Sequence, residues 1–388
     1  MKLSTTAPLT LAMAGATLAP VLLAYNQTPA ATLYNQLLAV FGWGLVLLLV
    51  RGHWDSRLSA WPLLAAASLL VFAMLKAPVT DAAGLLLLSA GSVLLLVGVN
   101  SPRAEPLAEG FAAGLLLAGL LSFAIGAVQV FAPAWADGQW IARSGFVGRA
   151  VGNVRQPNHL ATLLLMAAVG LILLAQRRRW PTAICVALMA ALIGAVVLSA
   201  SRTGLWFGVP LLLLWGLVDR SLEPRLRWLL IATPLLAGLA WLGMHLWAAS
   251  GLGVFGAEQR LDREGAGSPS RVKILLNAWS LLMQEPGGVG WGGFNRAWTL
   301  SPFPDRPIAF FDHTHNLPMQ LLVELGWAWG GLVLLLLSMV AGQALLAAWR
   351  ARGEAAPLQR AALMLALIVA VHSMLEYPLW YAYFLLPT

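Results

Sequence analysis

Charged residues and cysteines are both scarce in this chain. Only 10% of its 388 residues are charged, against roughly 25% in soluble domains, while 60% are hydrophobic. This balance excludes an ordinary soluble enzyme and predicts an integral membrane protein. Cys185 is the only cysteine, which excludes an intramolecular disulfide. The net charge of +8 is spread over loops and no basic–aromatic groove module occurs, so we expect no nucleic-acid partner.

Long apolar runs recur along the whole sequence. Helices that cross a hydrocarbon core of roughly 30 Å need such runs, whereas the strands of a membrane barrel alternate apolar and polar residues. We therefore expect an all-α integral membrane protein, one transmembrane domain over 1–388, with about 12 spans. The predicted spans lie near 8–25, 31–50, 60–76, 84–99, 107–131, 157–175, 181–198, 203–218, 228–249, 317–349 and 359–375, and a final one starts near 378.

Two of these runs carry further expectations. The first follows Lys2 and resembles a signal peptide, but more spans follow it, so we expect a retained helix. The run 317–349 is too long for a single span, and we expect a short, partly buried turn before the true span near Trp327.

The basic residues predict an orientation. Basic residues in short loops favour the cytoplasm, and a cytoplasmic N-terminus places them in every inner loop. These inner residues are Arg51, Arg57, Arg103, Arg177, Arg178, Arg179, Arg220, Arg225, Arg227, Arg350, Arg352 and Arg360. Arg155 and Arg202 depart from the rule, because each falls on the outer side at a helix end, where an unpaired cation is costly. We therefore expect an anion-binding site on the outer, periplasmic face.

Residues 250–316 form the one large extramembrane segment that we predict, a periplasmic loop containing a short helix. The stretch RVKILLNAWSLLMQ has apolar residues at helical spacing, with Ser270 as its expected N-cap, and suits a helix that lies on the membrane surface. It carries Arg271 and Lys273, whose alternative role is a solvated helix face. The run PGGVGWGGF at 286–294 predicts tight turns or a close backbone approach.

The motif GRAVGNVRQPNHLA at 148–161 leads into a helix. Pro157 suits the first turn of that helix, which puts Gln156, Asn158 and His159 at its N-terminus. Free N–H groups and the helix dipole favour an anion there. Arg149 and Arg155 add positive charge to the same motif. The alternative interpretation is a polar helix cap at the membrane interface.

The motif SASRTG at 199–204 is a break between two spans, too short to fold as a loop. Its Arg202 can hold a phosphate with a planar, two-pronged guanidinium. The alternative is an interfacial arginine whose head reaches toward water.

The motif FDHTHN holds Asp312, His313, His315 and Asn316 just before a span. Histidine titrates near neutral pH and is the usual general base of enzymes. Two histidines two residues apart could instead bind a metal, but no second Cys/His cluster lies close in sequence, so we expect no metal or other cofactor. Glu324 follows on the next helix, where a carboxylate within the membrane indicates function and suits pairing with Arg or His.

The last motif, HSMLEYPLWYAYF at 372–384, places His372 and Glu376 four residues apart, which predicts one shared helix face. Tyr377 begins a group of aromatic residues that is typical of an interfacial anchor.

Taken in order, these motifs resemble the O-antigen ligase family, which includes bacterial protein O-oligosaccharyltransferases. The matching segments are QPNHLA at 156–161, SASRTG at 199–204, the Arg271 segment with Trp279, PGGVGWGGF at 286–294, HTHN at 313–316 with ELG at 324–326, and HSMLEYPLWYAYF. The resemblance covers about residues 157–384 and leaves the N-terminal spans matched by hydropathy alone.

The resemblance implies an enzyme of the bacterial inner membrane that takes a glycan from undecaprenyl diphosphate and works without a metal. It implies that His315, Arg202 and Arg271 are essential, with the active site on the periplasmic face. We expect lipid A-core as the acceptor. The ending HSMLEYPLWY, however, is closer to the protein-glycosylating branch, so a Ser or Thr of a protein is an alternative acceptor. An O-antigen polymerase and, from another class, a membrane transporter are further alternatives.

The chemistry of these residues agrees with glycan transfer from a lipid diphosphate. A lipid diphosphate is an anion at the membrane edge and becomes a good leaving group once arginines neutralise it. Either His313 or His315 could take the proton of the attacking hydroxyl; the resemblance favours His315. Asp312 is the only carboxylate near them in sequence, so we predict a single displacement that inverts the anomeric centre. Supporting residues are expected to be His313, Asn316, Gln156, Asn158, Lys273, Glu324, His372, Glu376 and Tyr377.

Overall fold

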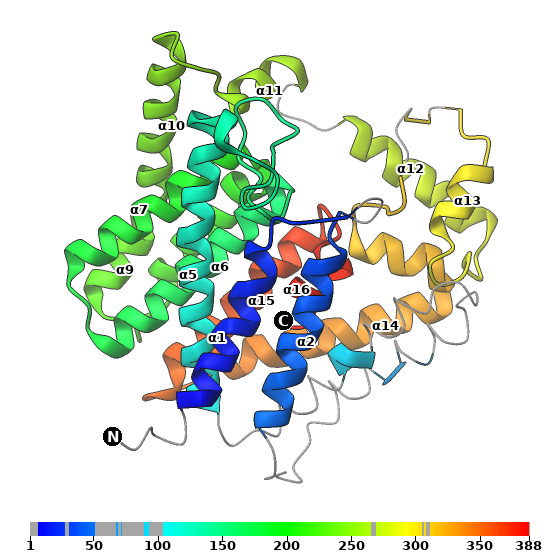
Figure 1. The fold of residues 1–388 in the computed structure, drawn as a ribbon. Helices are drawn as coiled ribbons and strands as arrows, with labels where there is room; N and C mark the ends of the chain where they lie inside the picture. Colours follow the sequence, from blue (N-terminus) through cyan, green and yellow to red (C-terminus); the bar gives the residue numbers. More distant parts are fainter. Residues whose placement is uncertain are drawn as a thin grey trace.

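The computed structural model is helical throughout its regular structure (Figure 1). It describes residues 7–27, 31–50, 67–68, 71, 89–92, 104–264, 269–304, 306–307 and 311–387. The spans predicted at 60–76 and 84–99 lie almost wholly outside the described residues. Arg51, Arg57 and Arg103 lie outside them as well.

Five helices in the described part are long and apolar enough to cross a membrane. They are α5 (Ala104–Phe131), α6 (Pro157–Arg178), α7 (Thr182–Ser199), α14 (Leu317–Arg350) and α15 (Ala355–Ser373). The pair α9 (Pro224–Ile231) and α10 (Thr233–Ala249) makes a sixth if its 43° bend lies within one span. Shorter apolar helices are α1 (Ala7–Leu22), α2 (Leu33–Leu49) and α8 (Val209–Val218). An all-α membrane protein is confirmed, and the total of about 12 spans remains a prediction.

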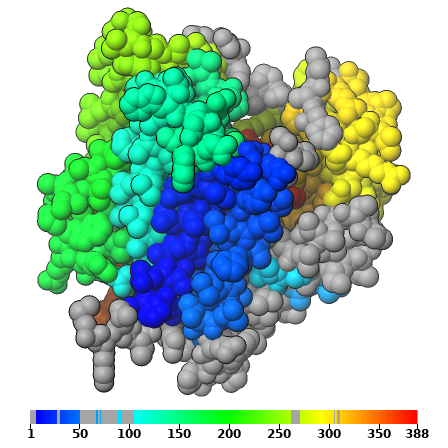
Figure 2. Space-filling view, in the orientation of Figure 1, coloured from blue at the N-terminus to red at the C-terminus, as the bar shows by residue number. Residues whose placement is uncertain are grey.

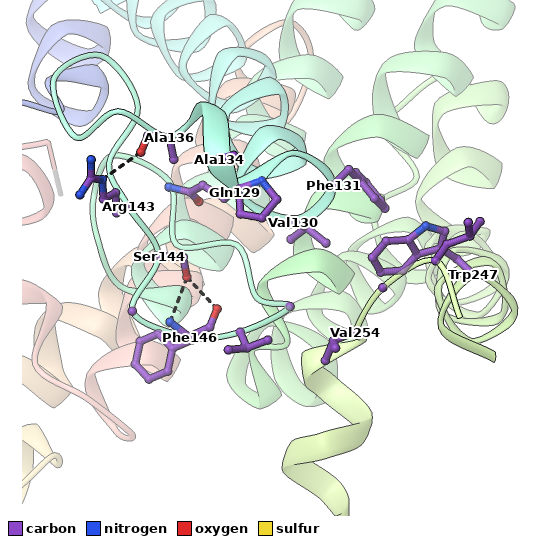
Figure 3. A pocket seen from close by; sticks show the side chains of 16 residues that line it. Gln129, Val130, Phe131, Ala134, Ala136, Arg143, Ser144, Phe146, Trp247 and Val254 are labelled. Carbon is purple, nitrogen blue, oxygen red and sulfur yellow. Dashed lines mark hydrogen bonds between the residues drawn. The ribbon is translucent and has the colours of Figure 1, made fainter. Parts of the chain in front are cut away.

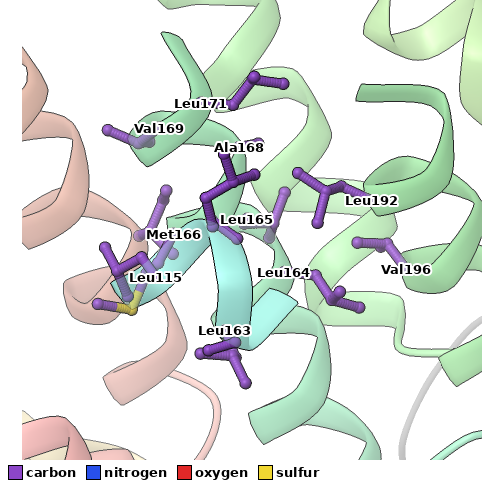
Figure 4. Close-up of a cluster of buried hydrophobic side chains, with 14 of the residues drawn as sticks. Leu115, Leu163, Leu164, Leu165, Met166, Ala168, Val169, Leu171, Leu192 and Val196 are labelled. Atoms are coloured by element: carbon purple, nitrogen blue, oxygen red, sulfur yellow. The ribbon is translucent and has the colours of Figure 1, made fainter. Parts of the chain in front are cut away.

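Helix α6 lies at the centre of the bundle, and its apolar window is entirely buried. It packs against α5, α7 and α15, and Figure 4 shows its leucines meeting Leu115 of α5 and Leu192 of α7. Small residues let these helices approach closely, as is usual in membrane bundles. At Gly208, a Cβ would overlap Leu165 of α6. This glycine ends a π-helical turn, Gly204–Gly208, that leads from the SASRTG break into α8.

Helix α14 is broken near its start, as the length of its apolar run predicts. Gly326 has φ 80° and ψ 176°, a conformation that essentially only glycine adopts. The segment before it is buried, including Leu321, Val323 and Leu325. The predicted short buried turn before Trp327 is therefore confirmed.

The segment 250–316 folds beside the bundle. It contains α11 (Gly256–Glu264), α12 (Pro269–Gln284) and α13 (Phe294–Leu300), so the prediction of one short helix was incomplete. The predicted N-cap was wrong, because α12 begins at Pro269 and Ser270 already lies inside the helix. Phe294 and Trp298 of α13 are fully buried against α12 and the start of α14. Figure 2 shows a hollow between these yellow segments and the blue and green bundle, with red C-terminal residues visible inside it.

The span predicted to start near 378 stays a prediction, and the described chain after α15 continues to residue 387. It forms a 3-10 turn, η3 (Pro378–Trp380), and the four-residue helix α16 (Ala382–Leu385). Helix α16 packs against α2, and Gln36 Oε1 accepts a hydrogen bond from Ala382 N at 3.4 Å. The C-terminal motif is thus folded back onto the N-terminal helices.

Candidate active site

The site-bearing motifs meet where four helices end. The starts of α6 and α14 and the ends of α7 and α15 lie together, because hydrogen bonds join Asn158 to both Ser201 and Glu376, and His315 to Glu376. Successive spans run in opposite directions. The start of one span therefore lies at the same end of the bundle as the end of the span before it, and the motifs at these positions share that end. The predicted gathering of these motifs on one face is therefore what the fold produces.

Glu376 connects these motifs. Its Oε1 accepts hydrogen bonds from Asn158 Nδ2 at 3.0 Å and from the Arg271 guanidinium, while Oε2 lies 2.7 Å from His315 Nδ1. The side chain is only 7% exposed. Burial alone would raise its pKa, but the hydrogen bond from His315 and the charges of His315 and Arg271 lower the pKa to about 2. Glu376 is therefore ionised near neutral pH.

The ionised carboxylate determines which nitrogen of His315 carries a proton. A carboxylate can only accept hydrogen bonds, so Nδ1 of His315 carries the hydrogen and donates it. Nε2 then keeps its lone pair and can take a proton from a substrate. A carboxylate that fixes the tautomer and orientation of an imidazole is the arrangement found in Ser-His-Asp enzymes. This geometry favours His315 over His313 as the base.

His315 is held in an unusual backbone conformation, with φ at 56°. Non-glycine residues rarely adopt it, so neighbouring contacts must hold it. Asn316 caps α14 through Oδ1, which accepts from Met319 N at 2.9 Å, and its Nδ2 donates to Met374 O at 3.0 Å. Thr314 N donates to Gln320 Oε1 at 2.8 Å. The HTHN motif is thus fixed to both α14 and the end of α15.

His313 has a different environment. Its ring stacks on Tyr377, with ring centroids 4.4 Å apart and a 14° angle between planes, and meets Trp380 edge-on. Its Nδ1 lies 2.8 Å from Asp312 Oδ1. Tyr377 also lies edge-on to His315 at 5.1 Å. His313 and Tyr377 therefore form the border of the site next to His315.

The two basic residues of α12 point in different directions. Arg271 faces the bundle, where it pairs with Glu376 and is 24% exposed. Lys273 is exposed. The spacing of two residues on a helix, about 200° apart, explains this separation. Lys273 is therefore not brought into the set of side chains around Glu376.

The other predicted arginines divide into two groups. Arg202 directly follows Ser201, whose Oγ donates to Asn158 Oδ1 at 2.6 Å, so the backbone of Arg202 lies beside the site. Arg149 reaches the same end of α7, donating from Nε to Ser199 O at 3.2 Å. Arg155 instead donates to Ala24 O, after α1, and burial lowers its pKa. Arg155 is thus turned toward the N-terminal helices.

Glu324 is buried but lies in a different environment. Its Oε1 accepts a hydrogen bond from Phe294 N at 3.3 Å. Its backbone oxygen accepts from Gly290 N at 3.0 Å, and Val323 O accepts from Val289 N at 2.9 Å. These bonds fix the glycine-rich run to the first segment of α14, which is the close backbone approach that the run predicts.

The C-terminal pair keeps the helical spacing predicted for it. Glu376 N donates to His372 O at 2.9 Å, so the residues are one turn apart, but α15 ends at Ser373. The His372 side chain is fully buried, and its Nδ1 lies 2.8 Å from Thr162 Oγ1. Glu376 contacts Asn158, which lies one turn before Thr162 on α6. Both side chains therefore meet the same face of α6, and the predicted shared face is confirmed.

A second polar layer lies behind Glu376, and it includes Thr162, which sequence reasoning missed. Gln156 caps α6 by accepting from His159 N at 2.7 Å, which confirms the predicted helix start. His159 is buried 3.5 Å from Tyr383 OH and edge-on to His372. Thr162 completes the layer. Its spacing of four from Asn158 was the available signal, since such residues share a helix face.

In the residues that the structure describes, no three His, Cys, Asp or Glu side chains converge as a metal site would require. His315 and Glu376 are two potential ligands, but Glu376 already pairs with the cation Arg271. These contacts define a helical membrane protein with a carboxylate, an imidazole and arginines gathered at one end of its bundle.

Comparison with known proteins agrees with the motifs. The family model described as O-antigen ligase matches residues 187–336, a range that contains Arg202, Arg271 and His315. A model described as protein glycosylation ligase matches 150–175, and one described as the C-terminal part of a virulence factor membrane-bound polymerase matches 360–388. All three matches fall on segments that contribute to the candidate site.

Two curated relatives come from Acinetobacter baylyi. The chain is 26% identical over 253 residues to a general O-oligosaccharyltransferase, covering 62% of this chain and 42% of the relative. It is 27% identical over 260 residues to a ComP-specific O-oligosaccharyltransferase, covering 63% and 43%. The chain thus spans less than half the length of these relatives. These matches confirm the resemblance to the O-antigen ligase family, including bacterial protein O-oligosaccharyltransferases.

Proposed function

We propose that this chain transfers a glycan from undecaprenyl diphosphate to a hydroxyl group, at the periplasmic face of the bacterial inner membrane. The observation that carries the proposal is that one buried carboxylate, Glu376, binds both an imidazole, His315, and a guanidinium, Arg271. The reaction needs a proton acceptor and a cation for a diphosphate, and this arrangement holds both close together.

The proposed reaction is a single displacement. His315 Nε2 takes the proton of the acceptor hydroxyl as its oxygen attacks the anomeric carbon. The bond from that carbon to the diphosphate oxygen breaks, and undecaprenyl diphosphate leaves with the electron pair. The new glycosidic bond forms on the opposite face, so the anomeric centre is inverted. No cofactor takes part in this scheme.

Arginines assist the leaving group. Arg271 and Arg202 neutralise charge on the departing diphosphate, and Arg149 lies at the same helix end. A positioned base contributes roughly 10²–10⁴ in rate, and each donor aimed at the developing charge contributes about 10²–10³. Several such cations together would therefore supply the larger share. Glu376 keeps Arg271 paired while no diphosphate is bound, which avoids a half-buried, unpaired cation.

The acceptor we propose is a Ser or Thr hydroxyl of a protein. Two of the relatives are O-oligosaccharyltransferases, and residues 150–175 match a protein glycosylation ligase, which supports this acceptor over the lipid A-core expected from the sequence. Lipid A-core is the second candidate, because residues 187–336 match the O-antigen ligase model. His315 would act on either hydroxyl in the same way.

The test uses the purified chain in lipid nanodiscs with undecaprenyl-linked glycan extracted from the organism that encodes it. Acceptors are supplied one at a time: periplasmic protein from that organism, lipid A-core, or a second molecule of donor. We expect glycan to be joined to protein. Joining to lipid A-core or to a second donor would replace the acceptor assignment, and transfer to none of the three would overturn the proposed function.

The base assignment is tested in the same assay. His315→Ala should lose at least about 10²-fold in transfer rate and keep its affinity for the donor. His245→Ala is the matched control, because His245 is half exposed and pairs with Glu258 away from the site. Normal transfer by His315→Ala would remove the base assignment. Transfer that stops in chelator and returns with zinc would replace the scheme by a metal-dependent one.

A further inference from the structure

A cavity of about 660 Å³ is lined by residues up to Gly148, which directly precedes Arg149 in the chain (Figure 3). The end of α5, the loop 133–148, the end of α10 and residues 252–254 form its walls. Its volume falls in the roughly 300–1,000 Å³ range of small-molecule sites. The proposed transfer chemistry does not use this cavity.

The cavity shares a wall with the candidate site. Gly148 lines it, and the next residue, Arg149, donates to Ser199 O at 3.2 Å, beside the SASRTG break. Gly148 O accepts from Gly256 N at 3.1 Å, which holds this wall in place. A molecule whose diphosphate lay against Arg149 would therefore lie near the cavity.

The cavity has one aromatic side and one polar side. Phe131 and Trp247 meet edge-to-face, with ring centroids 5.0 Å apart, and Figure 3 shows them together on one wall. Arg143 and Ser144 lie across from them in the same view. Arg143 uses Nε to donate to Ala136 O at 3.1 Å, which presents the rest of its guanidinium from a fixed position.

Hydrogen bonds from the buried side chain of Gln129 hold the loop that carries the polar side. Gln129 is 4% exposed, and its Nε2 donates to Ala142 O at 2.7 Å while its Oε1 accepts from Val151 N at 2.9 Å. Ser144 Oγ lies 2.8 Å from Arg149 O. The cavity wall is therefore built by specific hydrogen bonds and is formed before any ligand binds.

We propose that this cavity binds sugars of the donor glycan beyond the one attached to the diphosphate. Sugar rings present apolar C–H faces and polar hydroxyl edges, which match an aromatic wall opposite an arginine. Arg143 is the only charged residue among the described residues that line the cavity. A single cation opposite an aromatic wall suits a neutral or weakly acidic glycan. The inference rests on the proposed function and extends it to glycan selectivity.

Two variants alter the aromatic wall. Trp247→Ala removes the indole. Gly253→Ala keeps the indole but adds a Cβ that would overlap the Trp247 ring, so the ring must move. Trp140→Ala is the matched control, because Trp140 is 84% exposed and does not line the cavity.

The kinetic test compares two donors from the organism that encodes the protein: the intact lipid-linked glycan, and the same donor trimmed to its first sugar. We expect Trp247→Ala and Gly253→Ala to raise KM for the intact donor about tenfold, as the loss of one stacking contact allows, and to leave KM for the trimmed donor and kcat unchanged. Trp140→Ala should match the wild type. Equal effects on both donors, or no effect on either, would overturn the proposal.

A binding test separates this inference from the proposed function. The free oligosaccharide, released from the donor by mild acid, is added to the His315→Ala protein, and saturation-transfer NMR reports contact with its protons. We expect a signal that Trp247→Ala removes in the same background, even if no transfer to any acceptor is ever found. No signal from the free oligosaccharide would overturn the inference. The same holds if native mass spectrometry finds a phospholipid whose retention depends on Trp247.

Discussion

Glu376 Oε2 lies 2.7 Å from His315 Nδ1, although 61 positions separate the two residues in the chain. The other oxygen of the same carboxylate binds Asn158 and Arg271. Glu376 thus links His315, which would accept the proton, to Arg271, which would hold the diphosphate. A change at Glu376 must therefore affect both steps of the proposed reaction.

Glu376→Gln tests this link. The amide keeps the shape of the side chain, but its NH₂ group can donate to His315 Nδ1 and favour the tautomer that has its proton on Nε2. We expect transfer to fall by roughly 10²–10⁴-fold, as in enzymes whose histidine is held in the wrong tautomer. Single-turnover rates measure this. Glu258→Gln, which alters the exposed pair with His245, is the control. A loss below threefold, or about the same loss in the control, would contradict the orienting role.

Arg271→Lys tests whether the fork of the guanidinium is needed. Lysine keeps the charge but offers a single ammonium, which cannot hold a phosphate in the planar, bidentate way. We expect kcat/KM for the donor to fall about tenfold or more. Lys273→Arg, on the exposed face of the same helix, should change nothing. A double-mutant cycle of Arg271→Lys with Glu376→Gln should be non-additive by about 0.5–3 kcal/mol, since the two side chains touch. Additive losses would argue against the coupling.

Local sequence signals predicted the parts of the site that depend on local structure. Pro157 and Gln156 predicted the start of α6, and the length of the run 317–349 predicted the break now seen at Gly326. The contacts of Glu376 could not be predicted, because they join residues 61 to 218 positions apart and depend on how helices pack. The sequence therefore identified the motifs and their shared face, and the structure identified the residue that connects them.

The failures have equally physical causes. Arg155 carries the same charge as Arg202, but its backbone has φ at 60° and its side chain turns to Ala24. Lys273 carries the same charge as Arg271, but the spacing of two residues puts it about 200° away, on the exposed face of the helix. Side-chain direction at helix ends depends on tertiary contacts that periodicity does not contain.

Acid should destabilise the fold through Glu376. Its pKa is about 2 in the folded protein, against 4.5 for a free glutamate. Between these values the unfolded chain binds more protons, so this stabilisation is complete above pH 4.5 and is lost as the pH falls toward 2. We expect the urea midpoint of the wild type to fall more steeply across this window than that of Glu376→Gln. Tryptophan fluorescence of detergent-solubilised protein measures both midpoints. Parallel curves would show that Glu376 is not stabilised in the folded state.

Gly326→Ala should disrupt the site without touching it. Gly326 has φ at 80°, and a Cβ there would lie 2.5 Å from the carbonyl carbon of Gly287. Alanine therefore forces the first segment of α14, which begins directly after His315 and Asn316, away from the glycine-rich run. We expect a loss of roughly 2–4 kcal/mol in stability together with lower activity.

Gly331→Ala is the control for this substitution, because nothing lies within 4 Å of a Cβ at that helical position. Alanine there should be neutral or slightly stabilising, since it favours the helix. Cys185, the only cysteine, is buried, so its reaction with a thiol-specific dye during heating reports unfolding of both variants. If Gly326→Ala unfolded at the same temperature as the wild type and kept its transfer rate, the break in α14 would not be what positions His315. The HTHN motif would then be held by its contacts with the end of α15 alone, through Asn316 and Glu376.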